Sequence, residues 1–152
     1  MIYDKQKKED IITHWNEAKK YEDLPDRIPK PDQIFVFGSN IPGLHGKGAA
    51  KFAVQHYGAV YGQGEGLQGR SYALPTKRRW NQALTLAEVK RSVTRFVKFA
   101  QDHPELQFFV TRVGCGLAGF TDEYIAPMFV DAPLNCDLPW GWRDYNFNLK
   151  EL

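Results

Sequence analysis

IFVFGSNIPGLHGKGAAKFAVQHYG, residues 34–58, decides the fold class of this chain. Its first four residues form a short apolar run, which is typical of a buried strand. A glycine-rich loop follows at residues 38–48. The next segment carries apolar side chains at helical spacing, namely Ala49, Phe52, Ala53 and Tyr57. Because Gly58 follows this stripe, where glycine commonly ends a helix, the stretch predicts a strand, a glycine loop and a helix.

The rest of the chain repeats this alternation of strands and helices. Residues 71–75 and 107–113 are predicted strands, and the strand of residues 71–75 is expected to end at the loop of residues 76–80. The clearest helix begins at Thr85, which forms a capping-box pattern with Glu88 and precedes a continuous apolar stripe. A loop is expected over residues 58–69, a short helix over residues 122–130 and a last strand over residues 146–149. Strands that alternate with helices predict the α/β class.

Residues 1–31 are expected to form a separate N-terminal segment. Residues 5–21 are charged but carry apolar side chains at helical spacing, which predicts a helix. The three prolines that follow, Pro25, Pro29 and Pro31, cannot continue it and indicate a connector. A chain of 152 residues fits one domain, which is therefore expected over residues 32–152.

Composition limits the partners and the cellular compartment that are expected for the protein. The formal net charge of +2 is too small to indicate a nucleic-acid partner by itself. The two cysteines, Cys115 and Cys136, form neither a disulfide framework nor a Cys-x-x-Cys pair. The sequence has no apolar run of the ~18–20 residues that span a membrane, and its start has no signal-peptide pattern. These features predict a cytoplasmic protein without a membrane partner.

The loop of residues 38–48 is the first candidate site. Ligands in α/β sheets collect where strands end at their carboxyl edge. Gly46 and Gly48 allow close approach of the backbone, and the N–H groups of the following helix are free to bind an anion. Asn40 and His45 add polar groups for a ribose or a phosphate. The alternative is a tight turn that simply needs glycine.

GCGLAG, residues 114–119, matches the pattern G-x-G-x-x-G. A Rossmann fingerprint also needs an acidic residue about 20 positions later, at the end of the next strand. The segment around Cys136 and Asp137 is predicted as loop, so a Rossmann site is rejected. Three glycines between a strand and a helix still predict an anion cradle. Cys115 within it is either a nucleophile with a lowered pKa or a small packed residue.

Residues 76–80, TKRRW, form a basic cluster after a predicted strand. Lys77 comes directly after the strand end, where binding sites lie. Arg78, Arg79 and Trp80 indicate either a nucleic-acid surface or a solvated loop.

Together these motifs resemble the macro domain family. The resemblance rests on IFVFGSN, HGKGAA, SYALPTK, LTLAEVKRSV and FFVTRVGCGLAGF, which keep their order over about residues 33–130. It is strongest with the branch that includes DNA ADP-ribosyl glycohydrolase antitoxins and terminal ADP-ribose glycohydrolases. The chain is also similar to uncharacterised macro-like proteins of bacteria and phages.

This resemblance implies a three-layer fold with a mixed central sheet and helices on both faces. It implies that Asn40 binds a ribose, that Phe120 packs on the distal ribose and that Lys77 attacks the anomeric carbon. The aspartate that releases product in that branch corresponds to Ala118. A methyl group cannot transfer a proton, and Asp122 or Glu123 are the nearby substitutes.

The resulting hypothesis is a module that binds ADP-ribose or a related NAD-derived nucleotide, free or on a macromolecule, through two phosphate loops. No metal or cofactor is expected. Two alternatives stay open: an ADP-ribosyl glycohydrolase with Lys77 as nucleophile, and a nucleic-acid-binding protein that uses the basic loop. The expected ligand-binding residues are Gly38, Ser39, Asn40, His45, Gly46, Lys47, Gly48, Thr76, Gly114, Cys115, Gly116, Leu117, Ala118, Gly119 and Phe120.

Overall fold

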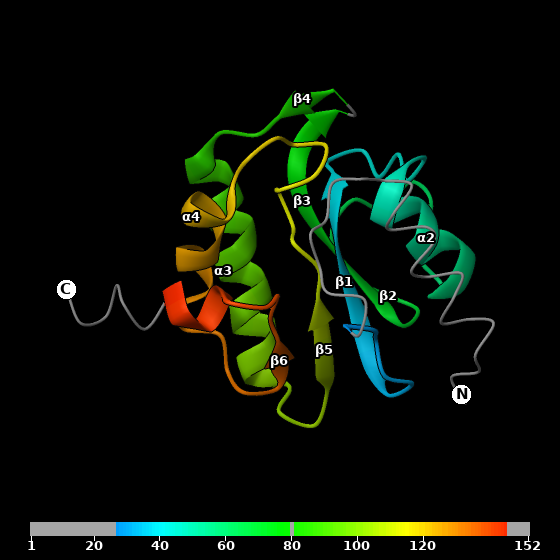
Figure 1. Ribbon diagram of the computed structural model, residues 1–152. Helices are drawn as coiled ribbons and strands as arrows, with labels where there is room; N and C mark the ends of the chain where they lie inside the picture. Colours follow the sequence, from blue (N-terminus) through cyan, green and yellow to red (C-terminus); the bar gives the residue numbers. More distant parts are fainter. Residues whose placement is uncertain (1–26, 80, 146–152) are drawn as a thin grey trace.

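The computed structural model describes residues 27–79 and 81–145 (Figure 1). The helix predicted over residues 5–21, Trp80 and the strand predicted over residues 146–149 lie outside the described residues. Within the described residues, no helix is long and apolar enough to cross a membrane.

A mixed sheet of six strands forms the middle layer, in the order β2-β3-β1-β5-β6, with β4 paired to β3. The parallel strands are β1 (Gln33–Asn40), β3 (Ser71–Arg79), β5 (Gln107–Val110) and β6 (Cys136–Asp137). The antiparallel partners of β3 are β2 (Gly66–Gln68) and β4 (Gln82–Ala83).

Helices cover both faces of this sheet (Figure 1). On one face lies α2 (Gly48–His56). On the other lie α3 (Leu86–Asp102), α4 (Asp122–Ile125) and the 3-10 helix η1 (Ala126–Phe129). The predicted α/β class with three layers is therefore confirmed.

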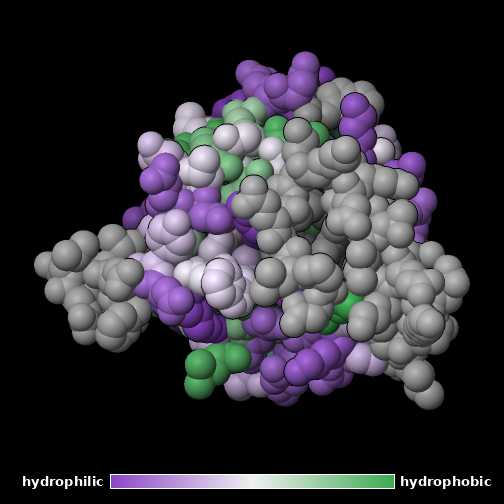
Figure 2. All heavy atoms as spheres, viewed as in Figure 1, coloured by the Kyte–Doolittle hydropathy of each residue, from purple (hydrophilic) through white to green (hydrophobic). Residues whose placement is uncertain are grey.

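Residues 34–37 of the central strand β1 form a continuous apolar run because both faces of this strand are buried. Phe35 and Phe37 belong to the core under α2, whereas Ile34 and Val36 belong to the core under α3. Side chains alternate between the two faces of a strand, and here both faces are buried. On the face shown in Figure 2, by contrast, hydrophilic residues dominate and hydrophobic atoms appear only in small, separate areas.

β1 lies between β3 on one side and β5 on the other, so successive connections from β1 run to opposite sides of it. This arrangement determines where the candidate site lies. The chain passes from β1 through α2 to β3 on one side, then through α3 to β5 on the other side of β1. At such a switch point the loops that leave adjacent parallel strands diverge and open a crevice. The carboxyl ends of β1, β3 and β5 therefore meet at one edge of the sheet.

The helix predicted between the first glycine loop and Gly58 and the helix predicted from Thr85 are confirmed as α2 and α3. The side chain of Thr85 accepts a hydrogen bond from the backbone of Glu88, and the Glu88 carboxylate accepts one from the backbone of Thr85, as in a capping box. Gly58 follows the last turn of α2 with φ of +72°, a left-handed conformation that glycine adopts without strain.

Three predicted boundaries were wrong. β3 does not end at Pro75 but continues to Arg79, because β4 folds back and pairs with it. Part of the loop predicted over residues 58–69 forms β2, which pairs with the opposite end of β3. The strand predicted over residues 107–113 leaves the sheet after Val110. Antiparallel pairing of β3 with the short strands just before and just after it in sequence decided the first two boundaries, and the polar residues of these strands carry no alternating apolar pattern that would have predicted it.

Residues 27 and 28, in the predicted N-terminal segment, contact the sheet. The guanidinium of Arg27 lies 4.0 Å from the centre of the Phe109 ring and donates to the carbonyl oxygens of Val110 and Asp137, at 2.7 and 2.8 Å. Ile28 packs against the core under α2. The end of the proline-bounded segment thus packs on the same core as α2 and is hydrogen-bonded to β5 and β6.

Candidate functional site

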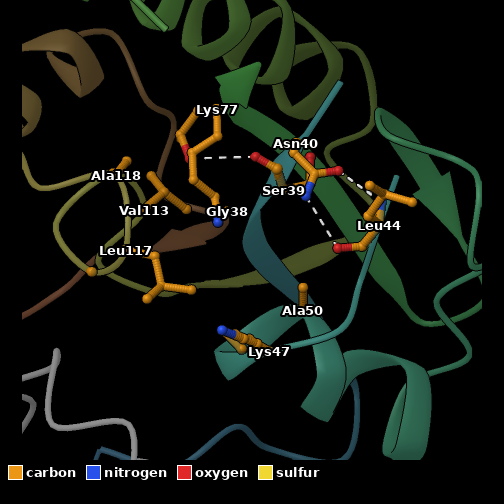
Figure 3. Close-up of a pocket in the computed structure, with 14 residues that line it drawn as sticks. Gly38, Ser39, Asn40, Leu44, Lys47, Ala50, Lys77, Val113, Leu117 and Ala118 are labelled. Atoms are coloured by element: carbon orange, nitrogen blue, oxygen red, sulfur yellow. Dashed lines mark hydrogen bonds between the residues drawn. The ribbon is translucent and has the colours of Figure 1, made fainter. Parts of the chain in front are cut away.

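A cleft lies at the edge where β1, β3 and β5 end (Figure 3), with a volume of about 540 Å³ including the part that is open to solvent. All three loops that the sequence singled out contribute to it. Its lining residues are Gly38, Ser39, Asn40, Leu44, Lys47, Ala49, Ala50, Thr76, Lys77, Val113, Gly114, Gly116, Leu117 and Ala118. Among the residues predicted for ligand binding, His45, Gly46, Gly48, Cys115, Gly119 and Phe120 are not in this lining.

Lys77 and Lys47 are the charged side chains that line the cleft. Lys77 comes from β3 and only 7% of it is exposed, whereas Lys47 precedes α2 and is exposed. Figure 3 shows the two side chains extending from opposite walls into the same part of the cleft. Burial lowers the pKa of the Lys77 ammonium, and the charge of Lys47 lowers it further. The cleft is therefore an electropositive site that favours anions.

Backbone N–H groups add to this positive potential. Ala49 and Ala50 lie in the first turn of α2, whose N–H groups have no partner within the helix and carry the positive end of its dipole. Across the cleft, the N–H groups of Gly116, Leu117 and Ala118 have no hydrogen-bond acceptor within the described residues. Such N–H groups are typical ligands of phosphate oxygens.

The neutral polar side chains of the cleft mainly hold its walls. Asn40 accepts a hydrogen bond from the backbone N–H of Leu44 at 2.7 Å and donates to the Leu44 carbonyl at 3.1 Å. The hydroxyl of Ser39 donates to the carbonyl of Gly64, and that of Thr76 donates to the carbonyl of Ser39. Asn40 keeps one amide hydrogen and one oxygen lone pair for a ligand. Its two hydrogen bonds with Leu44 stabilise the conformation of the loop that carries Lys47.

His45 lies outside the cleft, contrary to the prediction. Only 2% of it is exposed, and its ring packs edge-on against Phe37 in the core under α2. Its Nε2 lies 2.9 Å from the carbonyl oxygen of Gln63. His45 is therefore a packing residue. Its contact with Gln63 joins the loop of residues 38–48 to the segment before β2.

Cys115 and Phe120, which were predicted to bind the ligand, are also not among the residues that line the cleft. They line a separate pocket on the other side of the loop, together with Arg112, Asp122 and Tyr145, among others. The Cys115 thiol lies 3.6 Å from a carboxylate oxygen of Asp122. Neither residue is placed to touch a ligand held between Lys47 and Lys77.

Asp122 is a structural anchor and lines the pocket of Cys115 and Phe120, not the cleft that contains Ala118. Its carboxylate accepts two hydrogen bonds from the Arg112 guanidinium, at 3.0 and 3.1 Å, and one from the Trp142 indole at 2.9 Å. These contacts join the second glycine loop to the end of the described chain. The carboxylate is therefore engaged by Arg112 and Trp142, and Asp122 is not among the residues that line the cleft with Lys77.

Replacing this anchor should loosen the second loop. We expect Asp122→Ala to lower the free energy of unfolding by about 2 kcal/mol, because it leaves the half-buried Arg112 without its charged partner. Urea denaturation measures this difference. Glu123→Ala is the matched control, since Glu123 is exposed and adjacent in sequence. Equal stability of the two variants would contradict the anchoring role.

The basic cluster does not form a continuous basic surface. Lys77 faces the cleft, whereas Arg78 pairs with Glu88 at 2.9 Å and Arg79 is exposed. Successive residues of a strand point to opposite faces, so extension of β3 through this segment separates Lys77 from Arg78, which is held by Glu88. This arrangement weakens the nucleic-acid alternative.

A Rossmann site at residues 114–119 was rejected because the segment around Asp137 was predicted as loop. The structure excludes an acidic partner at Asp137 for a different reason. The segment predicted as loop around Cys136 forms the short strand β6, parallel to β5, so Asp137 does end the next strand. Its carboxylate, however, accepts a hydrogen bond from Gln33 at 3.2 Å and lies 3.8 Å from Arg27. Asp137 pairs in register with Phe109, within the sheet and before the glycine loop begins.

Sequence reasoning missed four residues of the lining: Leu44, Ala49, Ala50 and Val113. Ala49 and Ala50 could have been inferred from the predicted helix start, because first-turn N–H groups face whatever lies before the helix. No group of three or more metal-binding side chains occurs in the described parts of the chain.

The fold and the site together define an α/β protein with an electropositive cleft at the carboxyl edge of its parallel strands. Comparisons of the chain with protein-family models, with curated proteins and with solved structures gave no match.

Proposed function

We propose that the protein binds ADP-ribose or a related nucleotide, free or attached to a macromolecule, through its diphosphate. The observation that carries this proposal is the convergence of Lys47, Lys77 and two sets of backbone N–H groups on one cleft. The resemblance of the chain to macro domains, which bind ADP-ribose in an α/β fold, supports the choice of nucleotide.

The charges of the cleft favour a diphosphate over a neutral sugar or base. Both charged side chains in the lining are cationic. A phosphate on the N–H groups of Gly116 to Ala118 and one at the first turn of α2 would each gain charge-assisted hydrogen bonds. The two loops lie on opposite sides of the cleft, so one diphosphate spans them. The flanking sugars would then lie along the walls formed by Asn40 and Leu117.

Calorimetry with ADP-ribose tests this function. We expect ADP-ribose to release or absorb heat on binding and to raise the melting temperature, because a ligand that binds only the folded state stabilises it. Adenosine, which lacks the diphosphate, is the matched control ligand and should have little effect. If millimolar ADP-ribose causes neither heat nor thermal stabilisation, the proposal is wrong.

The alternative function is hydrolysis of an ADP-ribosyl linkage with Lys77 as nucleophile. Burial of Lys77 and its lowered pKa favour this alternative, because an amine attacks only when it is unprotonated. Ala118, which lines the cleft where the catalytic relatives have an aspartate, opposes it. Release of ADP-ribose from ADP-ribosylated DNA by the parent protein, and not by Lys77→Met, would support the enzyme over the binding module.

A further inference from the structure

A second hollow lies next to the cleft, between the end of β3 and the N-terminal half of α3. Its volume is about 570 Å³, including the part that is open to solvent. One wall is apolar and consists of Ile41, Pro75 and Leu84, whereas the other carries charged side chains that come mainly from α3. We call this hollow the α3 groove. It shares no lining residue with the cleft, so it is a separate surface.

The α3 groove adjoins the cleft at the end of β3. Ile41 directly follows Asn40 of the cleft, and its backbone N–H donates to the carbonyl of Lys77 at 3.0 Å. The backbone N–H of Leu84 donates to the carbonyl of Thr76, also at 3.0 Å. Since Thr76 and Lys77 line the cleft, one hydrogen bond separates the two lining surfaces at each of these points. A chain attached to a ligand in the cleft therefore lies within reach of the α3 groove.

The charged wall of the α3 groove leaves one cation without a partner. Glu65 accepts two hydrogen bonds from the Arg95 guanidinium, at 2.6 and 3.1 Å. Glu88 accepts two from the Arg78 guanidinium, at 2.9 and 3.1 Å. Arg91 is exposed and has neither a hydrogen-bond nor an ion-pair partner within residues 27–79 and 81–145. The α3 groove therefore offers one unpaired guanidinium opposite an apolar wall, and this favours a partner with a carboxylate.

A peptide fits these charges better than a nucleic acid does. The repeated phosphates of a nucleic-acid strand would face the carboxylates of Glu65 and Glu88, and like charges repel. A peptide brings a single carboxylate for Arg91, and its backbone N–H groups can donate to the remaining lone pairs of the two glutamates. Ile41 is 52% exposed, so an apolar side chain of the peptide would remove apolar surface from water.

We infer that the α3 groove binds a peptide with an acidic side chain next to an apolar one, and that this peptide belongs to the protein to which a bound ADP-ribose is attached. The guanidinium of Arg91 pairs with the acidic side chain, and Ile41 packs against the apolar one. The attachment to ADP-ribose rests on the proposed function of the cleft, whereas peptide binding by the α3 groove does not.

Binding of synthetic ADP-ribosyl peptides, measured by calorimetry, tests this inference. The peptides carry ADP-ribose through the same non-hydrolysable triazole linkage and differ only in whether a glutamate or a glutamine follows a leucine beside it. We expect the parent protein to bind the glutamate conjugate about fivefold more tightly, which is the upper range for an exposed ion pair. Arg91→Gln should abolish this difference and leave the affinity for free ADP-ribose unchanged.

Lys90→Gln is the matched control, because Lys90 is exposed and adjacent on α3 but does not line the groove. This variant should keep the preference for the glutamate conjugate. Equal affinities of the parent protein for the two conjugates would overturn the inference. Tighter binding of an ADP-ribosyl oligonucleotide with the same linkage than of the glutamate conjugate would also overturn it, in favour of a nucleic-acid partner.

A charge exchange tests whether Arg91 itself contacts the peptide. Arg91→Glu should prefer a conjugate with lysine in place of the glutamate, because the exchange restores a pair of opposite charges. The parent protein should have the reverse preference. If both proteins prefer the same conjugate, the acidic side chain does not bind at Arg91 and the inference is wrong.

The peptides without ADP-ribose separate the α3 groove from the function of the cleft. At millimolar concentration, the glutamate peptide should shift the backbone amide NMR signals of Leu84 and Ser92 in the parent protein and not in Arg91→Gln. If these shifts occur while ADP-ribose fails to bind, the proposed function fails and peptide binding by the α3 groove stands. If ADP-ribose binds but neither these shifts nor a preference among the conjugates occurs, the proposed function stands and the groove inference fails.

Discussion

Lys77→Met is expected to weaken the binding of ADP-ribose by roughly 10- to 100-fold, while it raises the melting temperature of the free protein. The loss follows from removal of a charge-assisted hydrogen bond to a phosphate, which contributes about 1.5–3 kcal/mol. The gain follows because a buried ammonium is poorly solvated and faces Lys47, whereas a methionine of similar shape carries no charge. Calorimetry and thermal denaturation measure the two effects separately.

The stability gain should depend on pH in a defined direction. The pKa of Lys77 is lower in the folded protein than in the unfolded chain, so the unfolded chain binds more protons between the two pKa values. Below the folded pKa, the full cost of burying the charge is present. As pH rises from the folded pKa toward the ordinary lysine pKa of 10.5, this cost is lost. The advantage of Lys77→Met should therefore be largest below the folded pKa of Lys77 and disappear above that window.

Two controls make this prediction specific. Lys51→Met removes an equally positive but exposed side chain and should change neither affinity nor stability appreciably. Lys77→Arg keeps the charge and should retain more affinity than Lys77→Met. If Lys77→Met bound ADP-ribose as tightly as the parent protein, Lys77 would not contact the ligand.

Gly64→Ala is expected to lower the free energy of unfolding by about 3 kcal/mol or more. A Cβ atom at this position would lie 2.1 Å from the carbonyl oxygen of Ile41 and 2.5 Å from that of Asn40. Both are backbone atoms that cannot move alone, so the first loop would have to separate from the segment before β2. Denaturant unfolding measures the loss of stability.

The same substitution should also weaken ligand binding, because the carbonyl of Gly64 accepts the hydroxyl of Ser39 in the wall of the cleft. Gly38→Ala is the matched control for stability. There a Cβ atom would meet the side-chain oxygen of Thr76 at 3.3 Å, a contact that a small shift of that side chain relieves. Similar stabilities of the two variants would show that the first loop is not packed as tightly as described.

The candidate site was predictable where it depends on the order of motifs. Glycine loops after strands, and Lys77 at the end of SYALPTK, follow from the rule that ligands bind at the carboxyl ends of parallel strands. The direction of each side chain was not predictable. Cys115 and Ala118 belong to one loop, but only Ala118 lines the cleft. The left-handed backbone at Gly114, with φ of +79°, is part of the conformation that turns this loop, and sequence letters do not reveal it.

The sequence by itself determined the α/β class, both long helices and the three segments that carry the site, because periodicity, capping and glycine positions are local properties. Only the tertiary structure decided which residues face each other. β4 extended β3 past Lys77, Phe37 drew His45 into the core, and Arg27 with Gln33 bound Asp137. The contacts of Asp137 join segments distant in sequence, whereas the β3–β4 pairing and the Phe37–His45 contact are local but depend on the path of the backbone and the direction of the side chains, which become fixed only when the layers pack together.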